Sequence, residues 1–232
     1  MRGRSIAYAA VSLLFLAPAS AQSGADSVLR RDQGIVTYEV AGAAPQSLTA
    51  SINVSANVIA TTAIASLATL QLADSSEIRI GDRTTVEVGD LRAAAAANPG
   101  GGTIKLTRGA VRFNIVHPTG ARSNFKFVTP TSQLAVRGTL GYFISGPGGD
   151  QLYCVRCEPG DVSVTVGTQT YSVQSGQTLN ALVRNGQRST AIVANRTVNN
   201  PAIDQFLGGV SPFGESFANG NDPTLSGSGG RP

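Results

Sequence analysis

The 232-residue sequence has little of what most enzymes use for chemistry: one histidine, two cysteines, one methionine and no tryptophan. A Ser-His-Asp triad or a His-based metal site needs histidine beside other reactive groups, so a single histidine argues against both. Charged residues make up only 14% of the chain, below the roughly 25% of an average soluble domain. This argues against a highly charged helical bundle and against disorder driven by high net charge. The composition favours a β-rich, turn-rich protein without catalytic activity.

The first 21 residues have the features of a secretory signal peptide. Arg2 and Arg4 precede an apolar stretch over residues 6–17, and small residues at Ala19 and Ala21 fit a signal peptidase. We expect cleavage after Ala21, because the apolar stretch is shorter than the roughly 20 residues of a membrane-spanning helix. An uncleaved anchor is the alternative. The cleaved chain is expected to be periplasmic or secreted, with no membrane span.

The charge of the cleaved chain predicts no nucleic-acid partner. The formal net charge of +4 falls to +2 once Arg2 and Arg4 are removed. A nucleic-acid groove needs clustered cations to neutralise several phosphates, usually with aromatic residues for stacking. The basic residues are instead scattered along the chain: Arg79, Arg83, Arg92, Lys105, Arg108, Arg112, Arg122, Lys126 and Arg137.

Short runs of apolar and β-branched residues, separated by turn residues, fill the region from residue 34 to 193. Val36–Val40 alternates apolar and polar positions, and Val162–Val166 shows the clearest alternation. Such period-two patterning predicts strands with one buried and one exposed face. Phe125 and Phe127 share a face and are predicted core residues. The fold class is therefore predicted to be all-β, an antiparallel β-sandwich.

Two short peripheral helices and a tail complete the prediction. One helix is expected over residues 91–97 after Asp90, and another over residues 202–207 after Pro201. Residues 208–232 are rich in Gly, Ser, Asn and Pro and read as a flexible tail. The predicted division of the chain is residues 1–21 as signal peptide, 22–53 as an N-terminal β segment packing on the main domain, 54–194 as the sandwich, and 195–232 as helix and tail.

Cys154 and Cys157 form the only Cys-x-x-Cys sequence. Residues three apart in an extended strand lie about 10 Å apart on opposite faces, whereas a disulfide needs about 4.4–6.8 Å between Cα atoms. A bridge therefore requires a turn at Val155-Arg156. Two alternatives stay open: a local disulfide, which an oxidising compartment favours, or two free cysteines of which one is buried and one exposed.

Other chemistry-bearing residues are predicted to be structural. His117 precedes Pro118 and is expected on a surface turn. An acidic run offers oxygen ligands for a cation, but its spacing matches no calcium-binding loop, so solvated strand faces are the preferred interpretation. That run consists of Asp74, Glu77, Asp82, Glu87 and Asp90. The sequence thus predicts no catalytic residue, no cofactor and no metal site.

Four motifs follow one another in a recognisable order. Residues 129–143 contain a Thr-Pro step, then Val-Arg-Gly-Thr and an aromatic residue, Phe143. Residues 70–80, 104–115 and 158–177 supply an apolar hairpin, a Gly-containing strand pair and a closing Gly-x-Val-x-Val … Gly-Gln pattern. Together they resemble the FecR-domain family over roughly residues 54–183. Two departures are Ser75, where the family has a turn glycine, and an extra residue before Gly160.

The resemblance implies a β-sandwich of jelly-roll type in the periplasm. Full-length family members pass a signal from an outer-membrane receptor to a cytoplasmic sigma factor in iron-uptake regulation. Those regulators carry a cytoplasmic segment and a transmembrane helix that this chain is expected to lack, so the sigma-factor partner is not carried over. We expect an exported, non-catalytic binding or signalling module that recognises a protein or an envelope polysaccharide. The alternative is a structural or self-associating secreted protein.

The family-motif residues are expected to act structurally. Gly138 is expected to permit a positive φ, Thr139 to satisfy a buried backbone group, and Arg137 to pair with an acidic neighbour. The complete set of family-motif residues is Arg137, Gly138, Thr139, Phe143, Gly160 and Gly176.

Overall fold

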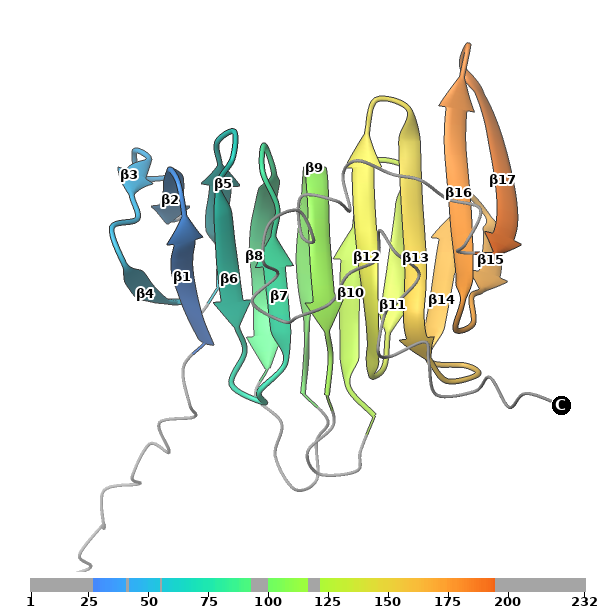
Figure 1. Cartoon of the computed structure of the whole chain (residues 1–232), viewed down its shortest axis with the longest axis horizontal. Helices are drawn as coiled ribbons and strands as arrows, with labels where there is room; N and C mark the ends of the chain where they lie inside the picture. The colour runs from blue at the N-terminus through green and yellow to red at the C-terminus, as the bar shows by residue number, and fades with distance from the viewer. Residues whose placement is uncertain (1–26, 41, 55, 93–99, 117–121, 195–232) are drawn as a thin grey trace, which may run out of the picture.

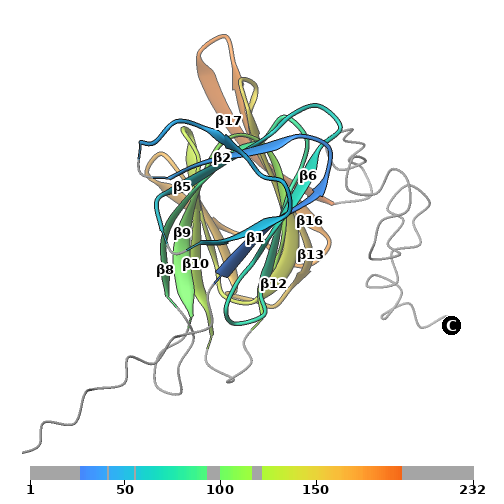
Figure 2. The same ribbon diagram turned by 90° about the vertical axis from the view of Figure 1, so that its left-hand side faces the viewer.

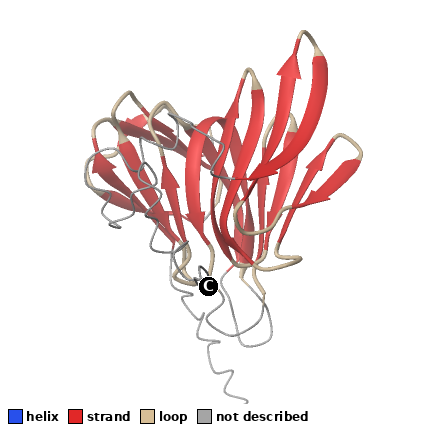
Figure 3. Ribbon diagram, turned by 45° about the vertical axis from the view of Figure 1, so that its right-hand side comes forward, coloured by secondary structure: helices blue, strands red, loops and turns tan. Residues whose placement is uncertain are grey.

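The computed structural model describes residues 27–40, 42–54, 56–92, 100–116 and 122–194, and in these residues it contains strands and connecting turns but no helix (Figure 3). The predicted all-β class is confirmed. The predicted signal peptide, His117, the helix over residues 202–207 and the tail lie outside the described residues. No helix within the described ranges is long and apolar enough to cross a membrane.

The strands, in chain order, are β1 (Ser27–Gln33), β2 (Val36–Val40), β3 (Gln46–Ser47), β4 (Ser51–Val54), β5 (Val58–Thr62), β6 (Leu67–Gln71), β7 (Glu77–Ile80), β8 (Thr85–Arg92), β9 (Gly101–Asn114), β10 (Asn124–Val128), β11 (Ser132–Val136), β12 (Thr139–Gly146), β13 (Gly149–Cys157), β14 (Val162–Val166), β15 (Gln169–Ser172), β16 (Gln177–Arg184) and β17 (Gln187–Ala194).

The pairings form two sheets that share β9. Sheet A has the order β4-β1-β6-β7-β9-β12-β13-β16-β17. Sheet B has the order β3-β2-β5-β8-β9-β10-β11-β14-β15. Among the described strands every pair is antiparallel except β9–β10, which is parallel. The strands advance along the long axis of the molecule from the N-terminal strands to the β16–β17 hairpin (Figure 1).

The helix predicted to start at Leu91 does not form there. Leu91 and Arg92 continue β8 and pair with Gly102 and Gly101 of β9. Leu91 also packs against the main hydrophobic core. Strand pairing and burial of Leu91 therefore override the local helix signal of Asp90; residues 93–97 lie outside the described residues.

Strand β9 passes from sheet B into sheet A at Gly109. Its first part pairs with β8 up to Arg108, and its last part pairs with β7 and β12. Gly109 has φ +100°, and a Cβ there would lie 2.1 Å from Thr84 Oγ1. Only glycine combines this backbone conformation with so close an approach, so Gly109 permits the crossing.

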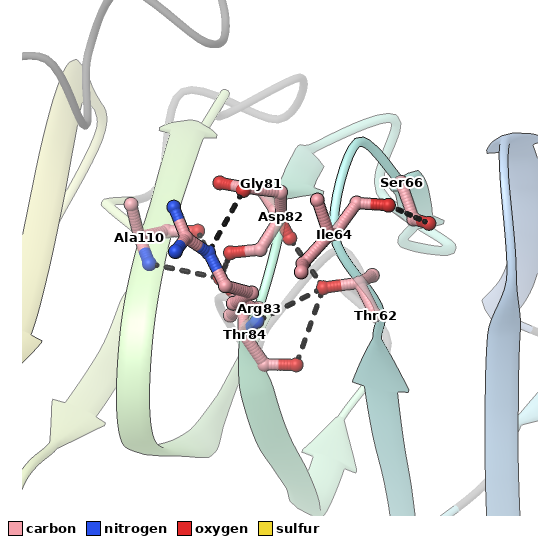
Figure 4. Close-up of polar contacts among 8 residues, drawn as sticks. All are labelled: Thr62, Ile64, Ser66, Gly81, Asp82, Arg83, Thr84 and Ala110. Atoms are coloured by element: carbon pink, nitrogen blue, oxygen red, sulfur yellow. Dashed lines mark hydrogen bonds and ion pairs between the residues drawn. The ribbon is translucent and has the colours of Figure 1, made fainter.

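A buried hydroxyl network holds this crossing in place (Figure 4). Thr84 Oγ1 accepts a hydrogen bond from the Ala110 N–H at 3.0 Å and donates to the Asp82 carbonyl at 2.9 Å. Thr62 Oγ1 accepts from the Thr84 N–H at 3.0 Å and donates to the Gly81 carbonyl. Thr62 and Thr84 are buried, so the two hydroxyls satisfy backbone groups that water cannot reach.

Both sheets bury one face in a common core, which the strands surround in the end-on view of Figure 2. The ring centroids of Phe113 and Phe127 lie 5.1 Å apart, and those of Phe127 and Phe143 lie 6.4 Å apart. Phe113 and Phe143 belong to sheet A and Phe127 to sheet B, so these contacts join the sheets. Phe125 and Phe127 are buried, as predicted.

Candidate functional site

The described residues hold no group of three or more His, Cys, Asp or Glu side chains that could bind a metal ion. Three members of the acidic run instead pair with basic neighbours. Glu77 Oε1 lies 3.0 Å from Arg79 Nε. Asp82 Oδ2 lies 3.1 Å from Arg83 Nε, and Glu87 Oε1 lies 2.7 Å from Lys105 Nζ. Burial lowers the pKa of Arg79, and the adjacent Glu77 carboxylate opposes this shift.

The Arg137-Gly138-Thr139 motif lies where the chain leaves β11 in sheet B and enters β12 in sheet A. Gly138 has φ +124°, the positive value expected for it. The Arg137 N–H donates to the Asp161 carbonyl at 2.9 Å. Two expectations are wrong: within the described residues no ion pair joins the exposed Arg137 side chain, and the buried Thr139 Oγ1 has no hydrogen-bond partner.

Gly160 and Gly176 occupy equivalent positions in two turns. Gly160 has φ +83° in the turn closed by the Asp161 N–H and the Glu158 carbonyl at 3.1 Å. Gly176 has φ +78° in the turn closed by the Gln177 N–H and the Gln174 carbonyl at 3.0 Å. A positive φ at the third position of a turn is the reason these positions require glycine. Each glycine therefore meets the backbone requirement of its turn.

Cys154 and Cys157 lie on the same face of β13 because the strand contains a β-bulge. Leu140 pairs with Arg156 and Gly141 pairs with Cys154, so Val155 is the extra residue. An extra residue reverses the alternation of faces, so both cysteines point into the main core. Their Cα atoms are 6.0 Å apart and their sulfurs are joined as a disulfide. The bulge takes the place of the expected turn, and both cysteines are buried.

A buried carboxylate, Asp150, fastens the β10–β11 turn of sheet B to β13 of sheet A. The hydroxyls of Thr129 and Ser132 each donate to Asp150 Oδ2 at 2.5 Å, and Thr131 donates to the same oxygen. Asp150 is 1% exposed. Because the partners of this oxygen all come from one turn, the cluster serves to join the two sheets. The sequence analysis identified the Thr-Pro step but not the acidic residue that it contacts.

The longest edge strand of the two sheets is β17, which forms one edge of sheet A. The β16–β17 hairpin closes at Asn185-Gly186, whose φ angles of +51° and +75° are those of a type I′ turn. This turn makes Arg184 and Gln187 a hydrogen-bonded pair, and such pairs alternate along the hairpin. The N–H and C=O groups of Arg188, Thr190 and Ile192 therefore point away from β16.

Strand β17 differs from the other edge strands in its length and in its exposed large apolar side chains. It has eight residues, whereas the edge strands β3, β4 and β15 have two, four and four. Ile192 is 40% exposed and Val193 is 36% exposed. A long edge strand with exposed apolar side chains is a template for pairing with another chain. The sequence analysis did not single out this hairpin, although Asn-Gly between alternating residues is its signal.

Known proteins match this chain at the level of family and fold. The family model described as FecR protein matches residues 58–187, more than half of the chain. Two crystal structures of a protein described as a candidate anti-sigma factor from Parabacteroides distasonis match at 12% identity and a TM-score of 0.47. The match covers 59% of this chain, which spans 59% of that protein's length. No curated protein matches the sequence.

Proposed function

Because this chain belongs to the FecR protein family, we propose that it is a non-catalytic signalling or regulatory module that binds a protein partner through β17. The family match confirms the resemblance drawn from the sequence motifs, and the regulatory role is the one that this resemblance implies. The observation that carries the choice of surface is the eight-residue, exposed edge strand of sheet A. The family motifs themselves lie in turns, sheet crossings and core, so they support the fold and not a reactive site.

The proposed mode of binding is strand addition. An extended peptide that lies beside β17 would exchange backbone hydrogen bonds with Arg188, Thr190 and Ile192, whose N–H and C=O groups face outward. Val193 and Ile192 lie on opposite faces of the strand and would contact alternate side chains of the added peptide. A polysaccharide has no backbone amides with this spacing, which favours a protein partner over the polysaccharide considered from the sequence.

Export to the periplasm or beyond the cell is part of the same proposal. Its support is the signal-like sequence of residues 1–21, with Arg2 and Arg4 before an apolar stretch and small residues at the cleavage site. The hairpin β12–β13 lies in sheet A, β14–β15 in sheet B and β16–β17 again in sheet A. This alternation supports a module built of two layers. The jelly-roll form of a β-sandwich and a link to iron uptake rest on family resemblance.

A proline substitution tests the edge directly. Thr190→Pro removes one outward-facing N–H, and an edge strand tolerates proline where the N–H does not bond to its neighbour. Tagged cleaved protein would be incubated with periplasmic extract from its own source, and captured proteins would be identified by mass spectrometry. We expect a partner that the wild-type protein captures and that Thr190→Pro loses.

Two matched variants control this experiment. Thr190→Ala removes the same side chain but keeps the N–H, so capture should be retained. Thr170→Pro removes an outward N–H from β15, the edge of sheet B, where Thr170 pairs with Thr165, and capture should again be retained. Equal capture by Thr190→Pro and wild type, with both proteins folded by circular dichroism, would refute the edge as the binding surface.

Self-association is the second candidate function, and the same edge favours it, because β17 of one copy could pair with β17 of another. Light scattering after size-exclusion chromatography distinguishes the two. A dimer that Thr190→Pro converts to a monomer would support self-association, whereas a wild-type monomer with edge-dependent capture supports the binding module.

A further inference from the structure

A row of core side chains runs across sheet A and ends in the β16–β17 hairpin (Figure 1). Phe143 pairs with Leu152, and Leu152 pairs with Leu179. Leu179 in turn pairs with Ile192 of β17. The first three belong to the main core and are at most 1% exposed, whereas Ile192 is 40% exposed. Because directly paired side chains lie on the same face of a sheet, Ile192 is the exposed end of a core row.

Two further residues of β17 share this inner face with Ile192. Alternate residues of a strand lie on one face, so the side chains of Arg188 and Thr190 lie on the same face as that of Ile192. Thr190 also pairs with Ala181, a residue of the main core. These three residues are the ones whose N–H and C=O groups point away from β16. An added strand therefore bonds to the backbone of the same residues whose side chains it meets on the inner face.

The β16–β17 hairpin is positively charged. Residues 177–194 contain Arg184 and Arg188 but no aspartate or glutamate. Arg188 is exposed, and within the described ranges its side chain forms no ion pair. Opposite charges on directly paired residues of two strands attract each other, and like charges repel. A partner strand with a carboxylate opposite Arg188 is therefore favoured over one with a cation at that position.

The direction of the added strand follows from the sheet that it extends. Every strand pair of sheet A in the described residues is antiparallel, and antiparallel pairing is slightly more stable per residue than parallel pairing. In an antiparallel pair, a residue whose N–H and C=O groups face the partner bonds to the residue directly opposite. The partner residues opposite Ile192, Thr190 and Arg188 therefore occur in that order, at every second position of the partner sequence.

We propose that β17 binds an antiparallel peptide segment with the pattern apolar-x-β-branched-x-acidic, an inference that rests on the proposed function. The apolar side chain covers Ile192 and extends the core row by one strand. The β-branched residue, threonine or valine, packs beside Thr190, because such residues pair well across strands. The acidic side chain pairs with Arg188. The partner of this edge is thus a protein segment of defined chemistry and direction.

A synthetic peptide tests this pattern. The probe is a capped, fluorescein-labelled peptide of sequence Ser-Val-Ile-Gln-Thr-Gln-Glu-Ser, and its binding to the cleaved protein would be measured by fluorescence polarisation. The valine lies opposite Val193, which is 36% exposed on the other face of β17. The control peptide has the reverse sequence, hence the same composition and charge. We expect the reverse peptide to bind about fivefold more weakly or worse, which corresponds to the loss of one favourable cross-strand pair.

Charge reversal tests the contact with Arg188. Arg188→Glu should weaken binding of the probe by about fivefold, and this variant should prefer a second peptide in which lysine replaces the glutamate. Arg184→Glu is the matched control, because it makes the same charge change in the same hairpin but on the opposite face: Arg184 pairs with Gln187, the neighbour of Arg188. The control variant should keep the preference for the glutamate peptide.

Failure of this inference and failure of the proposed function give different results. If Thr190→Pro abolishes binding of the probe, but the wild-type protein binds the forward and reverse peptides equally, the edge is the binding surface and the pattern is wrong. A preference for glutamate that persists in Arg188→Glu would overturn the pattern in the same way. Binding of the probe that survives Thr190→Pro would contradict both the pattern and the edge. No measurable binding of the probe would overturn the pattern, and capture of a partner would still test the edge.

Discussion

The Thr84 hydroxyl gives the sharpest test of how β9 is held between the two sheets. Thr84→Val keeps the shape of the side chain but removes the acceptor for the Ala110 N–H and the donor to the Asp82 carbonyl. Thr84 is fully buried, so water cannot replace the lost partners. Leaving a buried backbone group unsatisfied costs about 1–3 kcal/mol. For a domain of this size we expect Tm to fall by about 2–4 °C for each kcal/mol.

Thermal and urea unfolding, followed by far-ultraviolet circular dichroism, would measure this loss. Thr85→Val is the matched control, because Thr85 is the next residue and its hydroxyl makes only a 3.4 Å contact with Thr61 Oγ1 in a partly buried site. We expect the control to change stability by less than about 0.5 kcal/mol. If Thr84→Val lowered the free energy of unfolding no more than the control does, the Thr84 hydroxyl would not be needed to satisfy the backbone groups at the crossing.

Three further predictions follow from single positions. Titration of unfolded, unreduced protein should find no free thiol from Cys154 and Cys157, and two after reduction; two thiols before reduction would contradict the disulfide. Gly138→Val should destabilise the fold by about 1–3 kcal/mol, because φ is +124° there, and an unchanged Tm would count against this. Ser75→Gly should raise Tm or leave it unchanged, because Ser75 has φ +69°, a conformation that glycine adopts more easily. A lower Tm would show that the Ser75 side chain stabilises the fold by more than its backbone conformation costs.

The strands that the sequence predicted well are those with one buried and one solvent-exposed face. Val36–Val40 and Val162–Val166 match β2 and β14 as predicted, since alternation is the direct trace of a half-buried strand. Strand β13 was missed because its residues from Leu152 to Val155 are all buried, so it shows no alternation. Leu152 and Cys154 face the main core, whereas Tyr153 and Val155 belong to a second buried cluster, so both faces of this stretch are apolar.

The cysteine geometry and the sheet crossings could not be derived from local pattern. The distance argument for Cys154 and Cys157 assumed a regular strand, and a single extra residue, Val155, changes which face each cysteine occupies. A bulge of this kind depends on how β12 pairs with β13, which is a long-range property. The Asp150 cluster likewise joins residues about 20 positions apart. The turn glycines, in contrast, could be identified from the sequence, because a positive φ is a requirement of the local backbone.

The most direct measurement of the central claim is hydrogen exchange in β17, read by NMR for each amide with and without the captured partner. The account predicts that partner binding slows exchange at Arg188, Thr190 and Ile192, whose N–H groups face outward, and changes little at Ser189 and Ala191, which already bond to β16. Strand addition at this edge would be contradicted by unchanged exchange at these three amides on partner binding, together with protection of amides elsewhere on the surface.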